Sequence, residues 1–313
     1  MKIDLQTAKQ LLLSGAVVAI PTETVYGLAA WLGCERAIAS IFQLKGRPSH
    51  NPLILHIADK ESCRKYVRAL PAGFAELADA FWPGPLTLIL PIKEELIPAL
   101  ARASLPTAAF RVPSHPLTLE LLQTVQPLVA PSANKSGTPS STKPEHIEHD
   151  FGADFPVVDG GPSLHGVEST ILGHDDGVWY IARLGAISPE ELEKVLGYTL
   201  KILQKVKSQV ICPGQLLQHY APEAHLILSE KPFTECPRRS SHVVGYGDRH
   251  YAGAEKVYIL GNGNDPVAVS HHLYDTLRRL DQEKVTAAWV DMAIPENGLW
   301  KTIRERLFRA AKR

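Results

Sequence analysis

Apolar positions near the start of the chain first follow a helical period and then form a short continuous run. Residues 5–12 repeat leucine and alanine at helical spacing after Asp4, which can cap the helix, and Gly15 can end it. The apolar run 16–20 then predicts a buried strand. Helix and strand patterns keep alternating along the chain, and this alternation predicts an α/β fold.

The remaining elements of the first 205 residues are predicted from the same two periods. We expect strands at 53–57, 86–90, 108–112, 128–130, 169–172 and 178–182, and helices at 34–44, 116–125 and 189–196. A polar turn is expected after residue 20, and a basic loop at 45–47. The helix at 189–196 has the clearest boundaries, because Ser188 and Glu191 can form a capping box and Gly197 follows the last turn.

A change of pattern after residue 205 predicts a domain boundary. The segment at 210–224, VICPGQLLQHYAPEA, contains two prolines, a glycine and no clear period, which is typical of a linker. Beyond it, the strand-like runs HLIL, HVVGY, KVYIL and AAWVDM alternate with helical patterns at 266–280 and 299–311. We therefore expect a large twisted mixed-sheet domain over 1–205, a linker over 206–224 and a smaller Rossmann-like α/β domain over 225–313.

Composition agrees with two globular domains, and charge bears on the partners. The 313 residues are 45% hydrophobic and 21% charged, with 33 basic and 33 acidic side chains. A chain without net charge has no general attraction for a polyanion, so strong nucleic-acid binding is not expected. The chain has no apolar run of membrane-spanning length and its start lacks signal-peptide features, so we expect a cytoplasmic protein without membrane contact.

Cysteine and histidine spacings indicate neither disulfides nor a structural metal. The four cysteines lie far apart with no C-x-x-C pair, and the thirteen histidines form no H-E-x-x-H pattern. We therefore expect reduced cysteines and no protein-bound structural metal.

Polar clusters at the ends of predicted strands mark the candidate chemistry, because open α/β sheets bind ligands there. Each cluster alone is a weak signal, since proline, serine, asparagine and glycine are common in any loop. Neither a Walker phosphate loop nor a G-x-S-x-G elbow is present. In chain order the clusters are PTETVYG at 21–27, KGRPSHNP at 45–52, FRVP at 110–113, PSANKSG at 131–137, GVESTI at 166–171 and RLG at 183–185.

Taken in this order, the clusters resemble the YrdC-like domain of the threonylcarbamoyl-AMP synthase family over about residues 4–200. The linker and second domain resemble the long form of that family, in which a segment HYAP, here at 219–222, crosses the active site. The resemblance implies condensation of L-threonine, bicarbonate and ATP, bound with Mg²⁺, to threonylcarbamoyl-adenylate and pyrophosphate. It also implies transfer of the product by another complex to an adenosine of tRNA.

The resemblance assigns site residues to three groups. Catalytic roles are implied for Lys45, Arg47, Ser132 and Asn134. L-Threonine binding is implied for Thr24, His56, Arg111, Ala130 and Ser169. ATP binding is implied for Arg47, Asn51, Thr107, Ser132, Ser140, Arg183 and Tyr220.

Physical chemistry fits these roles and leaves alternatives open. Arg111 lies in an apolar strand, where an unpaired cation is costly, so it meets either a structural carboxylate or a ligand, and we favour the ligand. His56 in LILHIAD can equally be a core residue, and Lys45 with Arg47 can be a solvated turn. A general base is not evident from the sequence.

Two other functions are compatible with the same domain. One is a carbamoyltransferase that handles carbamoyl-adenylate, although such relatives carry acylphosphatase, zinc-finger or transferase segments that are not visible here. The other is an RNA-binding or ribosome-assembly factor, which the neutral charge and the lack of basic and aromatic interleaving oppose.

Overall fold

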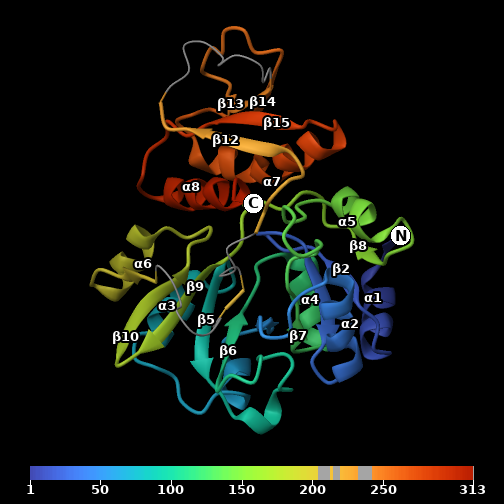
Figure 1. Ribbon diagram of the computed structural model, residues 1–313. Coiled ribbons are helices and arrows are strands. Elements are labelled where there is room, and N and C mark those ends of the chain that lie inside the picture. The colour runs from blue at the N-terminus through green and yellow to red at the C-terminus, as the bar shows by residue number, and fades with distance from the viewer. Residues whose placement is uncertain (204–211, 214–218, 232–241, 313) are drawn as a thin grey trace.

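A computed structural model of the chain describes residues 1–203, 212–213, 219–231 and 242–312, and it forms an α/β fold with two separate sheets (Figure 1). The larger sheet lies in the N-terminal two thirds of the chain, and the smaller one follows it. The predicted class, a large mixed sheet with a smaller α/β unit, is confirmed.

The large sheet orders its strands β1-β8-β2-β3-β7-β4-β6-β5-β9-β10-β11 and mixes parallel and antiparallel pairs. At its centre β4 and β6 are parallel, with His56 opposite Arg111, so the two side chains come to the same sheet edge. The strands are β1 (Lys2–Ile3), β2 (Val18–Ile20), β3 (Gly27–Trp31), β4 (Ile54–His56), β5 (Leu86–Pro91), β6 (Thr107–Arg111), β7 (Leu128–Val129), β8 (Val157–Val158), β9 (Thr170–Asp175), β10 (Val178–Arg183) and β11 (Lys201–Ile202).

Two helices around this sheet have the N-terminal capping contacts that the sequence predicts. The Asp4 side chain accepts the Thr7 N–H at 2.7 Å, and Ser188 forms the predicted capping box with Glu191. The helices are α1 (Leu5–Leu13), α2 (Glu35–Lys45), α3 (Phe74–Phe81), α4 (Pro116–Thr124), α5 (Pro144–Phe151) and α6 (Pro189–Leu196), with short 3₁₀ turns at Glu61–Lys65 and Glu94–Leu96.

The small sheet is parallel throughout, in the order β12-β15-β13-β14. Helices α7 and α8 lie between this sheet and the first domain (Figure 1). The elements are β12 (His225–Ser229), β13 (His242–Tyr246), β14 (Lys256–Gly261), α7 (Pro266–Gln282), β15 (Ala287–Asp291) and α8 (Leu299–Ala310).

The hydrophobic core of the second domain includes residues from the polar motifs of the first. The main core of the first domain lies against the large sheet. The core of the second domain extends across the interface to Val25 and Val167, which belong to the PTETVYG and GVESTI segments, and it includes Tyr220. The second domain is therefore packed directly onto loops of the first.

Several elements were not predicted. Helix α3 was missed although its apolar residues follow a helical period, whereas β3 and α5 have weak sequence signals. Strand β3 was read as part of a turn because its glycine and alanines are poor strand indicators. Helix α5 has the polar sequence PEHIEHDF with little apolar period. Lys45, predicted in a loop, is the last residue of α2, and Gly46 ends the helix in a left-handed conformation, with φ at 59°.

The proposed linker lies largely outside the described residues, so its boundaries stay a prediction. Of the cysteines, Cys34 and Cys63 are free thiols, Cys212 is buried, and Cys236 lies outside the described part of the chain. In that described part, no helix combines the length and apolar character needed to cross a membrane.

Candidate active site

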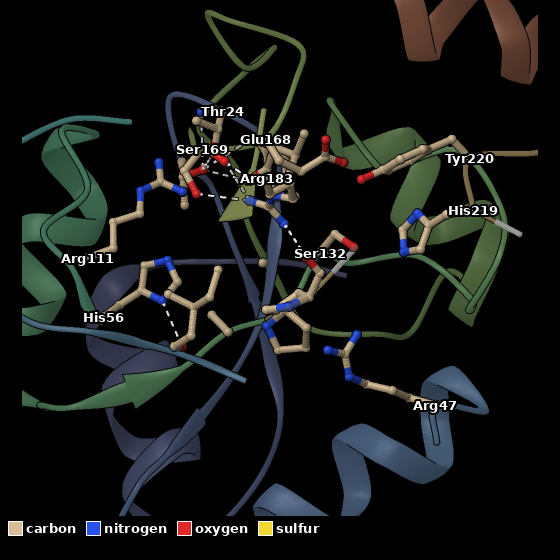
Figure 2. A pocket seen from close by; sticks show the side chains of 18 residues that line it. Thr24, Arg47, His56, Arg111, Ser132, Glu168, Ser169, Arg183, His219 and Tyr220 are labelled. Carbon is tan, nitrogen blue, oxygen red and sulfur yellow. Dashed lines mark hydrogen bonds between the residues drawn. The ribbon is translucent and has the colours of Figure 1, made fainter. Parts of the chain in front are cut away.

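A pocket of about 40 Å³ lies between the large sheet and the linker residues Pro213, His219 and Tyr220 (Figure 2). It brings together many residues that the sequence assigned to one site although they are far apart in the chain. The predicted residues that line it are Thr24, Arg47, His56, Arg111, Ala130, Ser132, Ser169, Arg183 and Tyr220. The other lining residues are Thr22, Val25, Tyr26, Gly27, Ile54, Pro131, Glu168, Pro213 and His219.

Arg111 has a structural carboxylate partner and also faces the pocket. Its Nη2 donates to Glu23 Oε1 at 2.7 Å and its Nε donates to Gly84 O at 3.3 Å, while both charged side chains are 5% exposed. Burial raises the pKa of Glu23, but Arg111 and the Ser114 N–H lower it further, so the carboxylate stays charged. The Nη1 group has no partner among the described residues, so the two alternatives for Arg111 are compatible: Glu23 orients the guanidinium and a free donor remains.

His56 lies beside Arg111 and is neutral. Burial and the Arg111 charge lower the pKa of the imidazole to about 3. Its Nδ1 is 3.3 Å from Ile54 O, and because a carbonyl only accepts, this contact places the ring proton on Nδ1. The Nε2 atom is then a hydrogen-bond acceptor for a ligand.

Arg47 and Arg183 form a cationic region of the pocket. Arg47 donates to Asn51 O at 3.1 Å and Pro52 O at 2.7 Å, and Arg183 donates to Ser169 O at 2.7 Å. Burial, followed by repulsion from Arg183, lowers the pKa of Arg47. Two buried guanidinium groups that repel each other favour an anion such as a polyphosphate between them.

Lys45 supports the PSANKSG loop from behind instead of lining the pocket. Its Nζ donates to Ser132 O and Asn134 O, each at 2.5 Å. Burial, followed by repulsion from Arg47, lowers the Lys45 pKa well below its usual value. The Asn134 side chain likewise donates to Lys135 O at 2.7 Å and Thr138 O at 2.9 Å, so it braces the same loop.

Three further predicted ATP ligands also lie outside the lining residues. Thr107 begins β6, so it lies at the opposite end of that strand from Arg111. Ser140 is fully buried and donates to Glu168 Oε1 at 2.7 Å. Asn51 is buried, and its Oδ1 has no hydrogen-bond partner in the part of the chain that the structure describes. Their nucleotide contacts stay predictions, and so does the catalytic role of Lys45.

Two glutamates in the quoted motifs were not assigned a role although they organise the site. Glu23 orients Arg111, and Glu168 accepts hydrogen bonds from Ser140, from Tyr274 at 2.8 Å and from Arg306 at 2.9 Å. Burial raises the Glu168 pKa, but Arg306 and Arg183 lower it to about 2. Each glutamate is the one charged residue of its motif. Because buried carboxylates are almost always paired, this pattern could have indicated a buried ion pair or hydrogen-bond partner.

A metal cluster was not predicted by the sequence. The described ranges contain no group of three or more His, Cys, Asp or Glu side chains placed to hold a metal ion.

Two family models match successive parts of the chain. A family model described as "Telomere recombination" matches residues 10–185, and one described as "Threonylcarbamoyl-AMP synthase, C-terminal domain" matches residues 187–312. A Bacillus subtilis protein named threonylcarbamoyl-AMP synthase is 38% identical over an alignment that covers 97% of this chain and 92% of that protein. The chain belongs to the threonylcarbamoyl-AMP synthase family.

Archaeal relatives extend this likeness to the three-dimensional structure. A Pyrococcus abyssi threonylcarbamoyl-AMP synthase is 36% identical, with 95% of this chain and 91% of that protein covered. The crystal structure of P. abyssi Sua5 complexed with L-threonine superposes with a TM-score of 0.88 at 34% identity, covering 98% of this chain and 94% of that one. The family relationship therefore includes both domains.

Proposed function

We propose that this chain condenses L-threonine, bicarbonate and the magnesium complex of ATP to threonylcarbamoyl-AMP and pyrophosphate. The observation that carries the proposal is one pocket with two unlike regions: a guanidinium with a free donor beside a neutral imidazole, and a pair of repelling guanidinium groups. The first suits an amino acid and the second a polyphosphate. Family membership supports ATP-dependent nucleotidyl transfer as the reaction class.

The amino-acid region fits threonine through charge and hydrogen bonding. The Arg111 Nη1 donor suits the substrate carboxylate, and the His56 Nε2 acceptor suits the ammonium, the hydroxyl or the carbamate N–H. Thr24, Ala130 and Ser169 supply small side chains around the same space. An imidazole with a pKa of about 3 is a weak base, so we assign His56 as an acceptor and not as the general base.

The chemistry proceeds by capture and displacement. The threonine amine adds to bicarbonate with loss of water, giving a carbamate, and a carbamate oxygen then attacks the α-phosphorus of ATP. The bond from that phosphorus to the bridging oxygen breaks, and pyrophosphate leaves with the electron pair. Arg47 and Arg183 stabilise the charge on the phosphates, so positioning and electrostatics supply most of the rate.

The linker residues limit access of water to the product. Pro213, His219 and Tyr220 line the pocket, and Tyr220 is 1% exposed. A mixed carbamic and phosphoric anhydride hydrolyses readily, so a covered site protects it. Release then requires these residues to move, after which a separate tRNA-modifying complex in the cytoplasm takes the product. Strong RNA binding by this chain is not part of the proposal.

Pyrophosphate release with one substrate omitted at a time tests this proposal. We expect release from ATP only when L-threonine, bicarbonate and Mg²⁺ are all present. Arg47→Gln should reduce release by about 100-fold or more, because the phosphates lose a buried cation, while the matched exposed variant Arg64→Gln should release at the normal rate. Release without threonine, or turnover of carbamoyl phosphate in its place, would favour a carbamoyltransferase.

A further inference from the structure

The second domain contacts the first mainly through α7 and α8, whose side chains reach the backbone of site loops (Figure 1). Arg278 of α7 donates to Pro139 O at 2.7 Å, next to Ser140. From α8, Thr302 donates to Gly185 O at 2.8 Å and Arg306 donates to Leu184 O at 2.7 Å. These loops adjoin residues of the proposed ATP region, so the second domain bears directly on the site.

Arg306 has the closest connection to the pocket. It is fully buried, and its Nε donates to Glu168 Oε2 at 2.9 Å, while Tyr274 of α7 donates to the same oxygen at 2.8 Å. Glu168 itself lines the pocket. The second domain thus holds a carboxylate of the pocket wall with one cation and one hydroxyl.

The same two residues enclose the ring of Tyr220. The Arg306 guanidinium lies 4.8 Å from the Tyr220 ring centroid, and the Tyr274 ring stacks on Tyr220 at 5.3 Å with an interplanar angle of 22°. In Figure 2 the Tyr220 hydroxyl points towards Glu168 and the pocket. A cation over a desolvated aromatic face and a stacked ring are both stabilising contacts.

The backbone of Tyr220 indicates that these contacts are needed. Its φ is 67°, a left-handed conformation that is costly for a bulky side chain and persists only where the surroundings fix it. The next residue is also held, because Ala221 N donates to Gly137 O at 2.8 Å. Tyr220 is therefore placed by its surroundings against its own backbone preference.

We propose that Arg306 and Tyr274 of the second domain are positioning residues for nucleotide binding, which act by fixing Tyr220 against the pocket while Glu168 anchors Arg306 to the pocket wall. The inference rests on the proposed function in taking the nucleotide to be ATP. Neither residue lines the pocket, but both contact two residues that do, Glu168 and Tyr220. Of these two, Tyr220 is the predicted ATP ligand, so we assign the effect on the nucleotide to Tyr220. The threonine region around Arg111 lies on the opposite side of the pocket from Tyr220 and is not involved (Figure 2).

A double-mutant cycle between Arg306→Gln and Tyr220→Ala tests the inference through the affinity for an ATP analogue with a methylene group between the α- and β-phosphates. Isothermal titration calorimetry should show each single variant binding the analogue about tenfold more weakly. Because Arg306 acts through Tyr220, the double variant should bind no more than about twofold more weakly than Tyr220→Ala alone. Affinity for L-threonine should change less than about twofold in every variant.

Asp275→Asn is the matched control. Asp275 is the neighbour of Tyr274 on α7 and pairs across the domain interface with Lys143 and His146, away from Glu168 and Tyr220. Asp275→Asn removes an interdomain ion pair that does not contact Tyr220. Any loss of analogue affinity that this variant causes should therefore add to the loss caused by Tyr220→Ala. If Arg306→Gln does not fold, Tyr274→Leu takes its place, because it removes the ring that stacks on Tyr220.

Additive effects of Arg306→Gln and Tyr220→Ala, or unchanged analogue affinity in Arg306→Gln, would overturn the positioning role while leaving the proposed function intact. Equal loss of threonine and analogue affinity would also overturn it, since that result indicates general damage to the fold. An intact protein that binds no analogue would overturn the proposed function itself.

Discussion

The Arg111 guanidinium serves both stability and binding, and a pair of substitutions can separate these two roles. Arg111→Met leaves Glu23 charged and buried, with its side chain 5% exposed. Removing one member of a buried ion pair costs about 3–5 kcal/mol of unfolding free energy. The lost donor to the threonine carboxylate is worth about 1.5–3 kcal/mol, or roughly 10- to 150-fold in affinity. Affinity for the ATP analogue should change much less, since Arg47 and Arg183 are untouched.

A second substitution then restores stability without restoring binding. Glu23→Gln in the Arg111→Met background removes the stranded charge but keeps an oxygen for the Ser114 N–H, which lies 3.1 Å from Glu23 Oε2. We expect the double variant to regain roughly 2 kcal/mol or more of the lost stability. Its threonine affinity should stay as weak as in Arg111→Met, because the donor is still missing.

Urea unfolding and calorimetric titration of both ligands measure these two effects independently. The reasoning about Arg111 would be refuted if threonine affinity returned with stability in the double variant. It would equally be refuted if Arg111→Met weakened the ATP analogue as much as threonine.

Three further predictions concern pH, domain docking and the loop behind the pocket. Burial lowers the pKa of His56 and His219 to about 3, so the native state does not bind the protons that the unfolded chain binds below about pH 6.5. The contribution of these rings to stability is full above about pH 7 and falls as the pH drops towards 3, by roughly 1–2 kcal/mol per ring at pH 5.5. Urea titrations should show a shallower fall for His56→Gln. Gly166 has φ at 70°, and an added Cβ would lie 2.4 Å from Ser270 O of the second domain, so Gly166→Ala should cost about 1–3 kcal/mol in urea unfolding and weaken ATP analogue binding. Gly137 has φ at 90° with no atom within 4 Å of an added Cβ. Gly137→Ala should therefore lose only the stability due to backbone strain and leave the contact between the domains intact. Lys45→Met removes the donor to Asn134 O and one of two donors to Ser132 O, which keeps the Asn134 N–H at 3.0 Å, and it should lower kcat/KM for ATP at least tenfold in the pyrophosphate assay. Lys135→Met, exposed on the same loop, should match the intact enzyme.

Clear caps made some elements predictable and their absence concealed others, although α3 was missed despite apolar residues at helical spacing. Helix α6 has its predicted bounds because Ser188, Glu191 and Gly197 specify both ends locally. Strand β3 depends instead on pairing with β2 and β7, which are neighbours in space and carry the β3 residues into the sheet. The pairing with β7, about 100 residues away, has no signal within the segment itself.

The site could be predicted as a set of residues but not as a set of partners. The family resemblance assigned Arg111 and Arg183 to the site, and the structure places both in one pocket. The pairing of Arg111 with Glu23 and of Glu168 with Arg306 joins residues 88 and 138 positions apart, so no local pattern encodes it. A neutral total charge likewise gave no sign of this pocket, where Arg47, Arg111 and Arg183 outnumber the lining carboxylate Glu168.

The most direct test of the account identifies the product made from ¹³C-bicarbonate. Purified protein is incubated with ATP, Mg²⁺, L-threonine and the labelled bicarbonate, and the mixture is analysed at once by mass spectrometry beside an unlabelled sample. The account predicts threonylcarbamoyl-AMP that is heavier by one mass unit in the labelled sample, with pyrophosphate formed in equal amount. An unlabelled adenylate, or AMP and pyrophosphate formed without any carbamoylated threonine, would contradict it.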